Sequence, residues 1–419
     1  MRKPFLTAVF VLGLFGSLVA VDRLAAEPDW SSWRGPTSDG HSADENLPVD
    51  WSPDDVLWKT PLKGEGQSSP CVWEDRIFLT RSENRGAKRY VFCVDRNNGD
   101  ILWEQLAWEG MPEPSHKMNN WASANCATDG EHVFAFFGKG GLHCYTSDGV
   151  KVWDTGDKLG EFVGPWGTAA TPVLYKDLVI QNCDADENAA IIAFNKKDGT
   201  QAWKTKRENF RGWSTPVLIK AGGREELVLN GHTGVYGYDP ATGKELWFCK
   251  GYSGRGTPTV TLGPEGLLYV VNGRPGPVFA VKPGGKDDVS ESHRAWFTKR
   301  GGGRDLPSPI VLDGQVLVVN MGGVLTSYDA KSGAELWKER LGGSYSAAPI
   351  AYKGLAFFIN EDGETVVVNP SEKTKIVARN KIDPAQGEIF RAYITPDDGQ
   401  LLIRSTKALY CLGKRTKAN

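Results

Sequence analysis

Tryptophan recurs along this chain at steps of 45, 50, 50, 44, 49 and 41 residues, and the residues around it recur as well. The positions are Trp58, Trp103, Trp153, Trp203, Trp247, Trp296 and Trp337. At five of them a glycine stands four residues earlier, in segments such as DPATGKELW; these are Gly99, Gly149, Gly199, Gly243 and Gly333. Glycine accepts the positive φ of a tight hairpin, and a nearby Asp or Asn favours the same turn. A unit repeated every 40 to 50 residues with several short apolar strands is typical of a radial β array.

Each unit begins after small residues and a proline, as in ATP, STP, GTP and PSP. An apolar strand follows, then a turn, a second apolar strand, a third strand with alternating apolar residues, and a fourth strand that carries the tryptophan. Four short strands joined by hairpins make one blade of a β-propeller. We therefore expect an all-β fold built from four-stranded antiparallel blades, with the tryptophans as structural wedges where neighbouring blades meet.

The two ends of the chain determine the number of blades. Residues 56–60 read as a fourth strand with no first three, whereas residues 390–412 supply only three strands. We expect the N-terminal strand to complete the last blade, which closes a ring of eight blades and leaves no free edge. The expected organisation is a signal peptide at residues 1–26, a strap across the outside at 27–50, the propeller at 51–413 and a C-terminal tail at 414–419.

The N-terminal residues predict export. A basic start at residues 2–3 precedes an apolar run at residues 5–21 and small residues before position 27, the pattern of a secretory signal peptide. We expect a periplasmic or secreted monomer that touches a membrane only if its leader stays uncleaved. Because no cysteine precedes Cys71, the protein is not expected to be a lipoprotein. The net charge of −2 gives no basic excess for binding nucleic acid.

The seven cysteines do not read as a disulfide framework. Most fall at repeat positions that other units fill with Ala, Ser, Gly, Val or Ile, so we expect small buried hydrophobic side chains. Cys183 and Cys249 have no such equivalents, and a bridge that involves them stays open.

The repeat resembles the pyrroloquinoline-quinone-like propeller repeats over about residues 51–412, with DPATGKELW and DAKSGAELW as near-ideal copies. One branch of that family, the quinoprotein dehydrogenases, holds the quinone and a calcium ion in the central funnel. A second is the propeller lipoprotein of the outer-membrane barrel-assembly machine, which binds proteins. A third comprises secreted proteins of planctomycete-like bacteria whose WRGP-type opening is matched here by residues 33–36. The chain lacks both the adjacent cysteine pair of the dehydrogenases and the acylated N-terminal cysteine of the lipoprotein.

Residues just ahead of each first strand are expected to line one face of the central channel. They form a set of arginines and aromatic side chains with one lysine: Lys117, Trp121, Trp166, Arg211, Trp213, Arg255, Arg304, Tyr345 and Arg391. Arginine offers paired donors and the rings offer stacking faces, so this funnel could hold an anionic or planar ligand. The alternative is that the arginines bridge blades and the rings pack.

Other polar features carry less weight. The irregular loop at residues 110–122 contains His116, a lone histidine without a second metal-binding or catalytic partner nearby in the sequence. The acidic segment at residues 184–188 reads as a solvated hairpin tip rather than a calcium loop, and asparagines that end five second strands read as turn residues. No nucleotide-binding, hydrolase or zinc-peptidase motif occurs, so no catalytic or metal-binding residue is assigned.

Two functions remain open. The sequence favours an exported, non-catalytic scaffold without a cofactor, whose funnel face binds a cell-envelope or secreted protein or an extracellular ligand. The alternative is an oxidoreductase that uses pyrroloquinoline quinone and calcium to oxidise alcohols or sugars. The missing cysteine pair and the short funnel loops favour the first.

Overall fold

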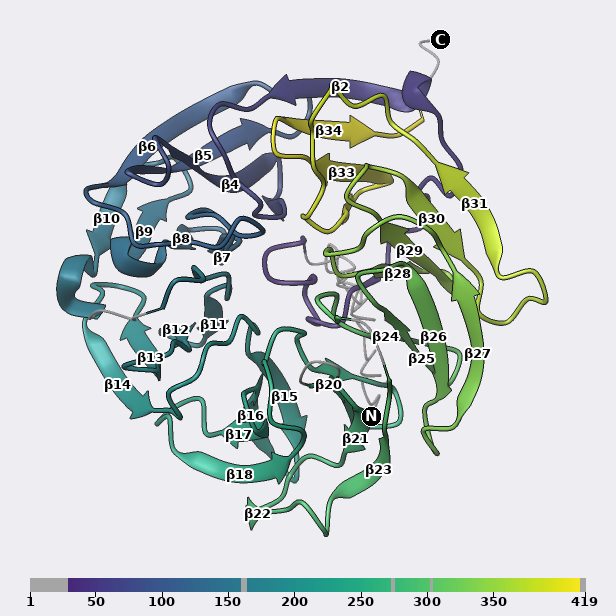
Figure 1. Cartoon of the computed structure of the whole chain (residues 1–419). Coiled ribbons are helices and arrows are strands. Elements are labelled where there is room, and N and C mark those ends of the chain that lie inside the picture. The colour runs from purple at the N-terminus through teal and green to yellow at the C-terminus, as the bar shows by residue number, and fades with distance from the viewer. Residues whose placement is uncertain (1–28, 160–163, 273–275, 302–303, 415–419) are drawn as a thin grey trace, which may run out of the picture.

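The computed structural model describes residues 29–159, 164–272, 276–301 and 304–414. These residues form eight β-sheets, arranged as the blades of a ring around a central channel (Figure 1). Each blade has four antiparallel strands, and two blades carry one further short strand in parallel. The predicted all-β, eight-bladed propeller is confirmed.

We number the blades in chain order. Blade 1 consists of β3 (Cys71–Trp73), β4 (Arg76–Glu83), β5 (Lys88–Asp95) and β6 (Ile101–Glu109), and blade 2 consists of β7 (Ala127–Thr128), β8 (His132–Phe136), β9 (Leu142–Thr146) and β10 (Lys151–Asp154). Blade 3 consists of β11 (Val173–Tyr175), β12 (Leu178–Cys183), β13 (Ala190–Asn195) and β14 (Gln201–Lys206). Blade 4 consists of β15 (Val217–Ala221), β16 (Arg224–Asn230), β17 (Gly234–Tyr238) and β18 (Glu245–Lys250), with the added strand β22 (Asp287–Asp288). Blade 5 consists of β19 (Thr261–Leu262), β20 (Leu268–Val271), β21 (Val278–Val281) and β23 (Arg294–Thr298), and blade 6 consists of β24 (Ile310–Leu312), β25 (Gln315–Val319), β26 (Val324–Asp329) and β27 (Glu335–Arg340). Blade 7 consists of β28 (Ile350–Tyr352), β29 (Leu355–Ile359), β30 (Thr365–Val368) and β31 (Ile376–Asn380), with the added strand β1 (His41–Ser42). Blade 8 consists of β32 (Thr395–Asp397), β33 (Gln400–Arg404), β34 (Ala408–Leu412) and β2 (Val56–Pro61). Three short 3-10 turns complete the regular structure of the described residues: η1 (Pro53–Asp55), η2 (Gly138–Gly140) and η3 (Gly156–Leu159).

The ring closes as predicted. Strand β2 from the start of the propeller pairs antiparallel with β34 from its end, with Lys59 opposite Tyr410. Figure 1 shows the purple β2 lying along the yellow blade 8. This pairing supplies blade 8 with its fourth strand, so the two ends of the propeller hold each other.

The hydrophobic core lies between successive blades. Phe134 of blade 2, for example, belongs to one buried cluster with Val179 and Ile192 of blade 3. Inner strands such as β20 are buried at every position because neighbouring blades cover both of their faces. This burial explains why these strands read as continuous apolar runs in the sequence.

Most of the repeated tryptophans pack against the next blade. The indole of Trp58 donates a hydrogen bond of 3.1 Å to the carbonyl of Arg96 and lies against Gly99, both in blade 1. Four others do the same one blade further on: Trp103, Trp153, Trp203 and Trp296 face Gly149, Gly199, Gly243 and Gly333. A Cβ on any of the five glycines would lie 2.4 to 2.6 Å from the nearest ring atom. The glycine of one repeat is therefore the surface on which the tryptophan of the preceding repeat packs.

Trp247 and Trp337 differ because the units after them lack that glycine. Ser292 and Lys373 stand where the glycine would be. Each of the two indoles instead donates a hydrogen bond of 2.8 Å within its own blade, Trp247 to Glu226 and Trp337 to Gln315.

The prediction of an external strap at residues 27–50 was wrong for its first part, residues 29–42. Residues 44–50 do lie over blades 7 and 8, where the Asp44 carboxylate accepts from the Gly399 N–H and the Val49 carbonyl accepts from Asn380 of the outer strand β31. Residues 29–42, which we call the plug, occupy the central channel (Figure 1). The carbonyl of Trp30 accepts from Val72 of blade 1, and that of Ser31 accepts from Thr128 of blade 2, both at 3.0 Å. At its far end the plug pairs with blade 7 through β1 and β28.

Arg34 fixes the middle of the plug. Its guanidinium, which has no solvent exposure, donates to Thr261 Oγ1 at 2.9 Å and to the carbonyl of Pro309 at 3.0 Å, reaching blades 5 and 6. Its backbone N–H donates to the Tyr393 hydroxyl of blade 8 at 3.2 Å. Burial lowers the pKa of this guanidinium to about 10. Arg34, which the sequence analysis placed in an external strap, is thus held inside the ring by hydrogen bonds to side chains and carbonyls of the blades.

All seven cysteines are buried and free, so the prediction of small buried side chains is confirmed and no bridge joins Cys183 to Cys249. The predicted leader at residues 1–26 and all but one residue of the predicted tail lie outside the described residues. In the described part of the chain, no helix is long and apolar enough to cross a membrane.

Candidate functional site

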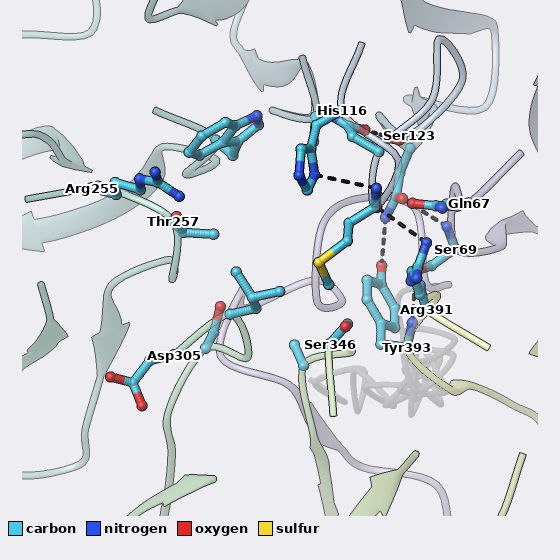
Figure 2. A pocket seen from close by; sticks show the side chains of 18 of the residues that line it. Gln67, Ser69, His116, Ser123, Arg255, Thr257, Asp305, Ser346, Arg391 and Tyr393 are labelled. Atoms are coloured by element: carbon cyan, nitrogen blue, oxygen red, sulfur yellow. Dashed lines mark hydrogen bonds between the residues drawn. The ribbon is translucent and has the colours of Figure 1, made fainter. Parts of the chain in front are cut away.

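A cavity of about 200 Å³ lies at one mouth of the channel, between the plug and the loop at residues 110–122, which we call the mouth loop. Trp33 of the plug and His116 and Met118 of the mouth loop line it, together with residues from every blade. Figure 2 shows Gln67, His116, Arg255, Ser346 and Arg391 around this space. The cavity is therefore a composite site that only the closed ring can form.

The structure brings together five of the nine predicted funnel residues. These are Trp166, Trp213, Arg255, Arg304 and Arg391. The other four predicted residues, Lys117, Trp121, Arg211 and Tyr345, do not line the cavity. Lys117 is exposed on the mouth loop. Tyr345 is completely buried in the core between blades 6 and 7.

Trp121 and Arg211 support the site from outside it. The indole of Trp121 donates to the carbonyl of Glu113 at 2.7 Å, which braces the mouth loop. The guanidinium of Arg211 bonds to Asp186 at 2.9 Å and lies 4.8 Å from the centre of the Trp166 ring. Arg211 therefore contacts Trp166 without lining the cavity, whereas His116 and Arg255, which contact the same ring, do line it.

A simple sequence signal identifies both lining residues that were predicted and lining residues that the prediction missed. In the six units whose first strand follows a proline, the residue three positions before that proline lines the cavity: Gln67, Ala169, Trp213, Arg255, Leu306 and Ser346. In blade 8 the proline lies inside β32, and Arg391, four residues before that strand as Gln67 is four residues before β3, lines the cavity. Tyr345, four positions before its proline, points into the core instead. Successive side chains of extended backbone point to opposite sides, so one step along the chain exchanges cavity for core.

Tyr393 fastens the floor of the cavity. Its hydroxyl accepts hydrogen bonds from the Trp30 indole at 3.3 Å, the Arg34 backbone N–H at 3.2 Å and the Asn125 amide at 3.1 Å. The ring of Trp33 packs edge-on against it, with 5.2 Å between ring centres. The plug is thus tied to blades 2 and 8 directly beneath the cavity.

The mouth loop is anchored at both of its ends. Near its start, Glu113 pairs with the completely buried Arg89, with one contact of 3.1 Å between Nη1 and Oε1. Near its end, the Asn119 amide donates to the carbonyl of Trp166 at 3.1 Å, and Arg391 Nη1 donates to the carbonyl of Met118 at 3.3 Å. These contacts fix the stretch that carries His116 over the cavity.

The surroundings of His116 favour its neutral imidazole. Burial lowers its pKa, and the positive charges of Arg304, Lys117, Arg255 and Arg391 lower it further. Its Nδ1 accepts the Met118 N–H at 3.3 Å, so the proton resides on Nε2. The ring centre lies 5.3 Å from that of Trp166.

Positive charge dominates the lining, which contains three arginines and one carboxylate, that of Asp305. Asp305 pairs with Arg300, and Figure 2 shows its carboxylate pointing away from the centre of the pocket. Arg391 pairs with Glu361 through contacts of 3.1 and 3.3 Å. Arg304 Nη1 lies 3.7 Å from the Met118 sulfur, and the Arg255 guanidinium lies 5.4 Å from the centre of the Trp166 ring. The lining therefore brings three guanidinium groups, which donate hydrogen bonds and accept none, into one cavity.

The acidic segment at residues 184–188 joins β12 to β13 and is exposed only at Glu187 and Asn188, so the prediction of a solvated hairpin tip was wrong for its first residues. Asp184 is buried and pairs with Arg207 at 2.6 and 3.2 Å, while Asp186 pairs with Arg211. The asparagines at the ends of second strands do serve turns and blade contacts. Asn360 Oδ1 accepts from two N–H groups of its own turn at 3.0 Å, and Asn230 Nδ2 donates to the carbonyl of Pro258 at 2.9 Å.

The donor set of the cavity does not fit a quinone with its calcium ion. Calcium takes six to eight oxygen ligands, several of them carboxylates. The single carboxylate of the lining is already paired with Arg300, and the described residues contain no group of three or more side chains arranged to hold a metal ion. We therefore derive no redox step at this site.

Comparisons with known proteins agree with the propeller. A family model described as outer membrane protein assembly factor BamB matches residues 87–260 and 235–383. No curated protein sequence matches the chain.

Solved structures share the fold. BamB from Moraxella catarrhalis superposes with a TM-score of 0.62 at 14% identity, over 87% of this chain and 98% of that one. A europium-containing methanol dehydrogenase gives 0.56 at 11% identity, over 93% and 99%. The computationally designed Ika8 protein gives 0.59 at 10% identity, over 86% and 99%. At these identities the likeness is one of fold alone.

Proposed function

The chain belongs to the family described as outer membrane protein assembly factor BamB, and from this premise we propose that it is an exported, non-catalytic propeller that binds its partner at the channel mouth. The partner is a cell-envelope or secreted protein, or an extracellular ligand, met in the periplasm or outside the cell. In this proposal the protein acts as a monomer and does not bind nucleic acid.

One observation carries this proposal: all eight blades contribute side chains to a single cavity that is rich in arginine and aromatic residues. Pockets with a few convergent polar groups among aromatic walls are the usual form of a binding site. The plug lies beneath the cavity, bonded to inner strands on opposite sides of the ring. A ligand is therefore received at the mouth and does not pass through the channel.

The comparisons support binding more than catalysis. The matching family is described as outer membrane protein assembly factor BamB, a description that names the assembly of proteins and no chemical reaction. The methanol dehydrogenase shares the fold at 11% identity, which is no evidence of a shared reaction. The described residues of this chain contain no group of three or more His, Cys, Asp or Glu side chains that could hold a metal ion.

Native mass spectrometry of the tagged protein, captured from the envelope of the cells that make it, tests the proposal because it detects protein and small-molecule partners alike. The test variant is Arg255→Ala with Arg304→Ala. The control, Lys197→Ala with Lys331→Ala, also removes two positive charges, from third-to-fourth-strand hairpins on the opposite face of the ring.

We expect the wild type and the control to carry the same bound mass, and the test variant to lose at least nine-tenths of it, about the effect of one lost charge-assisted contact. Equal occupancy in all three proteins, with unchanged thermal unfolding, would place the partner elsewhere and overturn the proposal.

A further inference from the structure

Most polar side chains of the mouth cavity are already hydrogen-bonded within the protein. Asn125 accepts from the Ser69 N–H at 2.7 Å and donates to the Tyr393 hydroxyl at 3.1 Å, and Ser308 Oγ accepts from the Thr259 N–H at 2.9 Å. Three more lining side chains are bonded in the same way: Asn119 to the Trp166 carbonyl, Ser123 to Asn119 and Ser346 to Glu361. A polar ligand gains little from groups whose hydrogen bonds it must first break.

The charged side chains of the lining also have partners. They are Asp305 with Arg300, Arg391 with Glu361, Arg255 with the Trp166 ring and Arg304 with the Met118 sulfur. The Thr257 hydroxyl and His116 Nε2 remain without a hydrogen bond to another described residue. The cavity therefore offers few polar groups to a ligand.

Apolar surface makes up the rest of the lining. It comes from the plug, the mouth loop and the loops ahead of blades 3, 4, 6 and 7: Trp33, Met118, Ala169, Trp213, Leu306 and Ala348. The indole N–H of Trp213 bonds to the Gly167 carbonyl at 2.9 Å, so the only polar atom of this side chain is already used. Indole rings and methionine sulfur both favour contact with an aromatic ring.

The size of the cavity restricts the ligand further. Pockets for drug-sized ligands enclose about 300 to 1,000 Å³, whereas a cavity of about 150 Å³ holds one benzene ring. At about 200 Å³ this cavity takes one benzene ring with one small substituent, which is the size of a phenylalanine side chain. A helix, about 10 Å wide with its side chains, does not enter it.

Exposed apolar side chains surround the cavity on the same face of the ring. Met111, Tyr252 and Ile389 are 82%, 51% and 36% exposed. They lie in the connections β6–β7, β18–β19 and β31–β32, each of which runs from an outer strand to the first strand of the next blade, as the mouth loop does. Exposed apolar groups around a pocket that accepts one anchoring side chain are typical of a surface that binds protein.

From the bonded polar groups, the apolar walls and the size together, and resting on the proposed function, we propose that the mouth cavity receives one phenylalanine side chain of a partner protein. The ring lies against Trp213, Met118 and Leu306. The backbone of the partner stays outside, on the face that carries Met111, Tyr252 and Ile389.

Methyl NMR of the mature protein, labelled with carbon-13 in its methionine methyl groups, locates binding directly. Met118 lines the cavity, whereas Met111 is exposed outside it and serves as an internal control. The probes are toluene, N-acetyl-phenylalanine amide and N-acetyl-asparagine amide. We expect the first two to shift the Met118 signal with dissociation constants of about 1 mM or lower and to leave Met111 unchanged. The asparagine amide should bind at least tenfold more weakly, because the hydrogen bonds that its side chain needs are already made within the lining.

Two matched variants add the same ring at different places. Ala169→Phe fills the cavity and should abolish the shifts of Met118, whereas Val150→Phe, at a position 64% exposed near the outer strand of blade 2, should leave them unchanged. Toluene that does not shift Met118 refutes an apolar site. Toluene that binds without the phenylalanine amide refutes a side chain as the occupant, and an asparagine amide that binds as well as the phenylalanine amide refutes the role of the bonded polar groups.

Capture from the cell envelope separates this inference from the proposed function. The bound partner should be lost from Ala169→Phe and kept by Val150→Phe. A partner that Ala169→Phe keeps, but that is lost when Arg255 and Arg304 are both changed to alanine, overturns the inference and leaves the proposed function standing. A partner that all of these variants keep overturns both.

Discussion

Packing of a tryptophan on the glycine of the next blade predicts a specific stability difference between two glycines of blade 6. Gly333 lies in the hairpin between β26 and β27 with φ +71°, and Gly314 lies in the hairpin between β24 and β25 with φ +70°. A Cβ at Gly333 would lie 2.4 Å from the Trp296 ring, whereas a Cβ at Gly314 would meet nothing within 4 Å. The two sites share their backbone strain and differ in packing.

The magnitudes follow from these contacts. Alanine at positive φ costs about 1 to 2 kcal/mol, offset by about 0.5 kcal/mol from a less flexible unfolded chain. Gly314→Ala should therefore cost about 1 kcal/mol. At Gly333 the displaced ring adds about 2 kcal/mol of overpacking and about 1 kcal/mol for the hydrogen bond of 2.9 Å from Trp296 to Ala330. Gly333→Ala should cost about 4 kcal/mol.

Urea unfolding of both variants and the wild type, followed by tryptophan fluorescence, measures the difference. We expect the midpoint to fall for Gly333→Ala by several times the fall for Gly314→Ala, with similar dependence on urea concentration. Equal losses would refute the reasoning, because backbone strain alone would then explain both.

Three further results are expected. Tyr393→Phe removes the acceptor of three buried donors and should cost about 3 kcal/mol and speed tryptic cleavage within the plug; unchanged cleavage would show that the plug is held elsewhere. Burial raises the pKa of Asp397 to about 6 despite its partner Arg96, so the folded state holds this proton more tightly than the unfolded state does, and stability should fall as pH rises from about 4 to 6. The free energy of unfolding of Asp397→Asn should therefore rise relative to that of the wild type across this pH range. A difference that stays constant over the range would contradict this. Burial raises the pKa of the Cys93 thiol to about 12 and shields all seven thiols from solvent, so a thiol reagent should modify no cysteine in the native protein and seven cysteines in denaturant. Modification of fewer than seven cysteines in denaturant would reveal a disulfide.

The propeller was predictable because its determinants are local and repeated. Each turn glycine and each fourth-strand tryptophan stand at fixed spacing, and the unpaired strand at residues 56–60 indicated how the ring closes. The departures at Trp247 and Trp337 also follow from the sequence, since the units after them lack the glycine.

The plug was not predictable by the same reasoning. Arg34 binds Thr261 and Pro309, which lie 227 and 275 residues away in the chain, and no local pattern reveals such partners. In the candidate site, Trp213 and Arg255 were found because they precede first strands, whereas Tyr345 failed because its neighbour Ser346 takes the cavity position. The count back from the proline decides which side chain faces the cavity.

Photo-crosslinking in living cells tests most directly whether the channel mouth is where this protein meets its partner. Benzoylphenylalanine at Lys117, exposed on the mouth loop, is compared with the same group at Val150, which is 64% exposed near the outer strand of blade 2. The account predicts crosslinked species of higher mass from position 117 and none from position 150. Crosslinks from position 150 alone would contradict it.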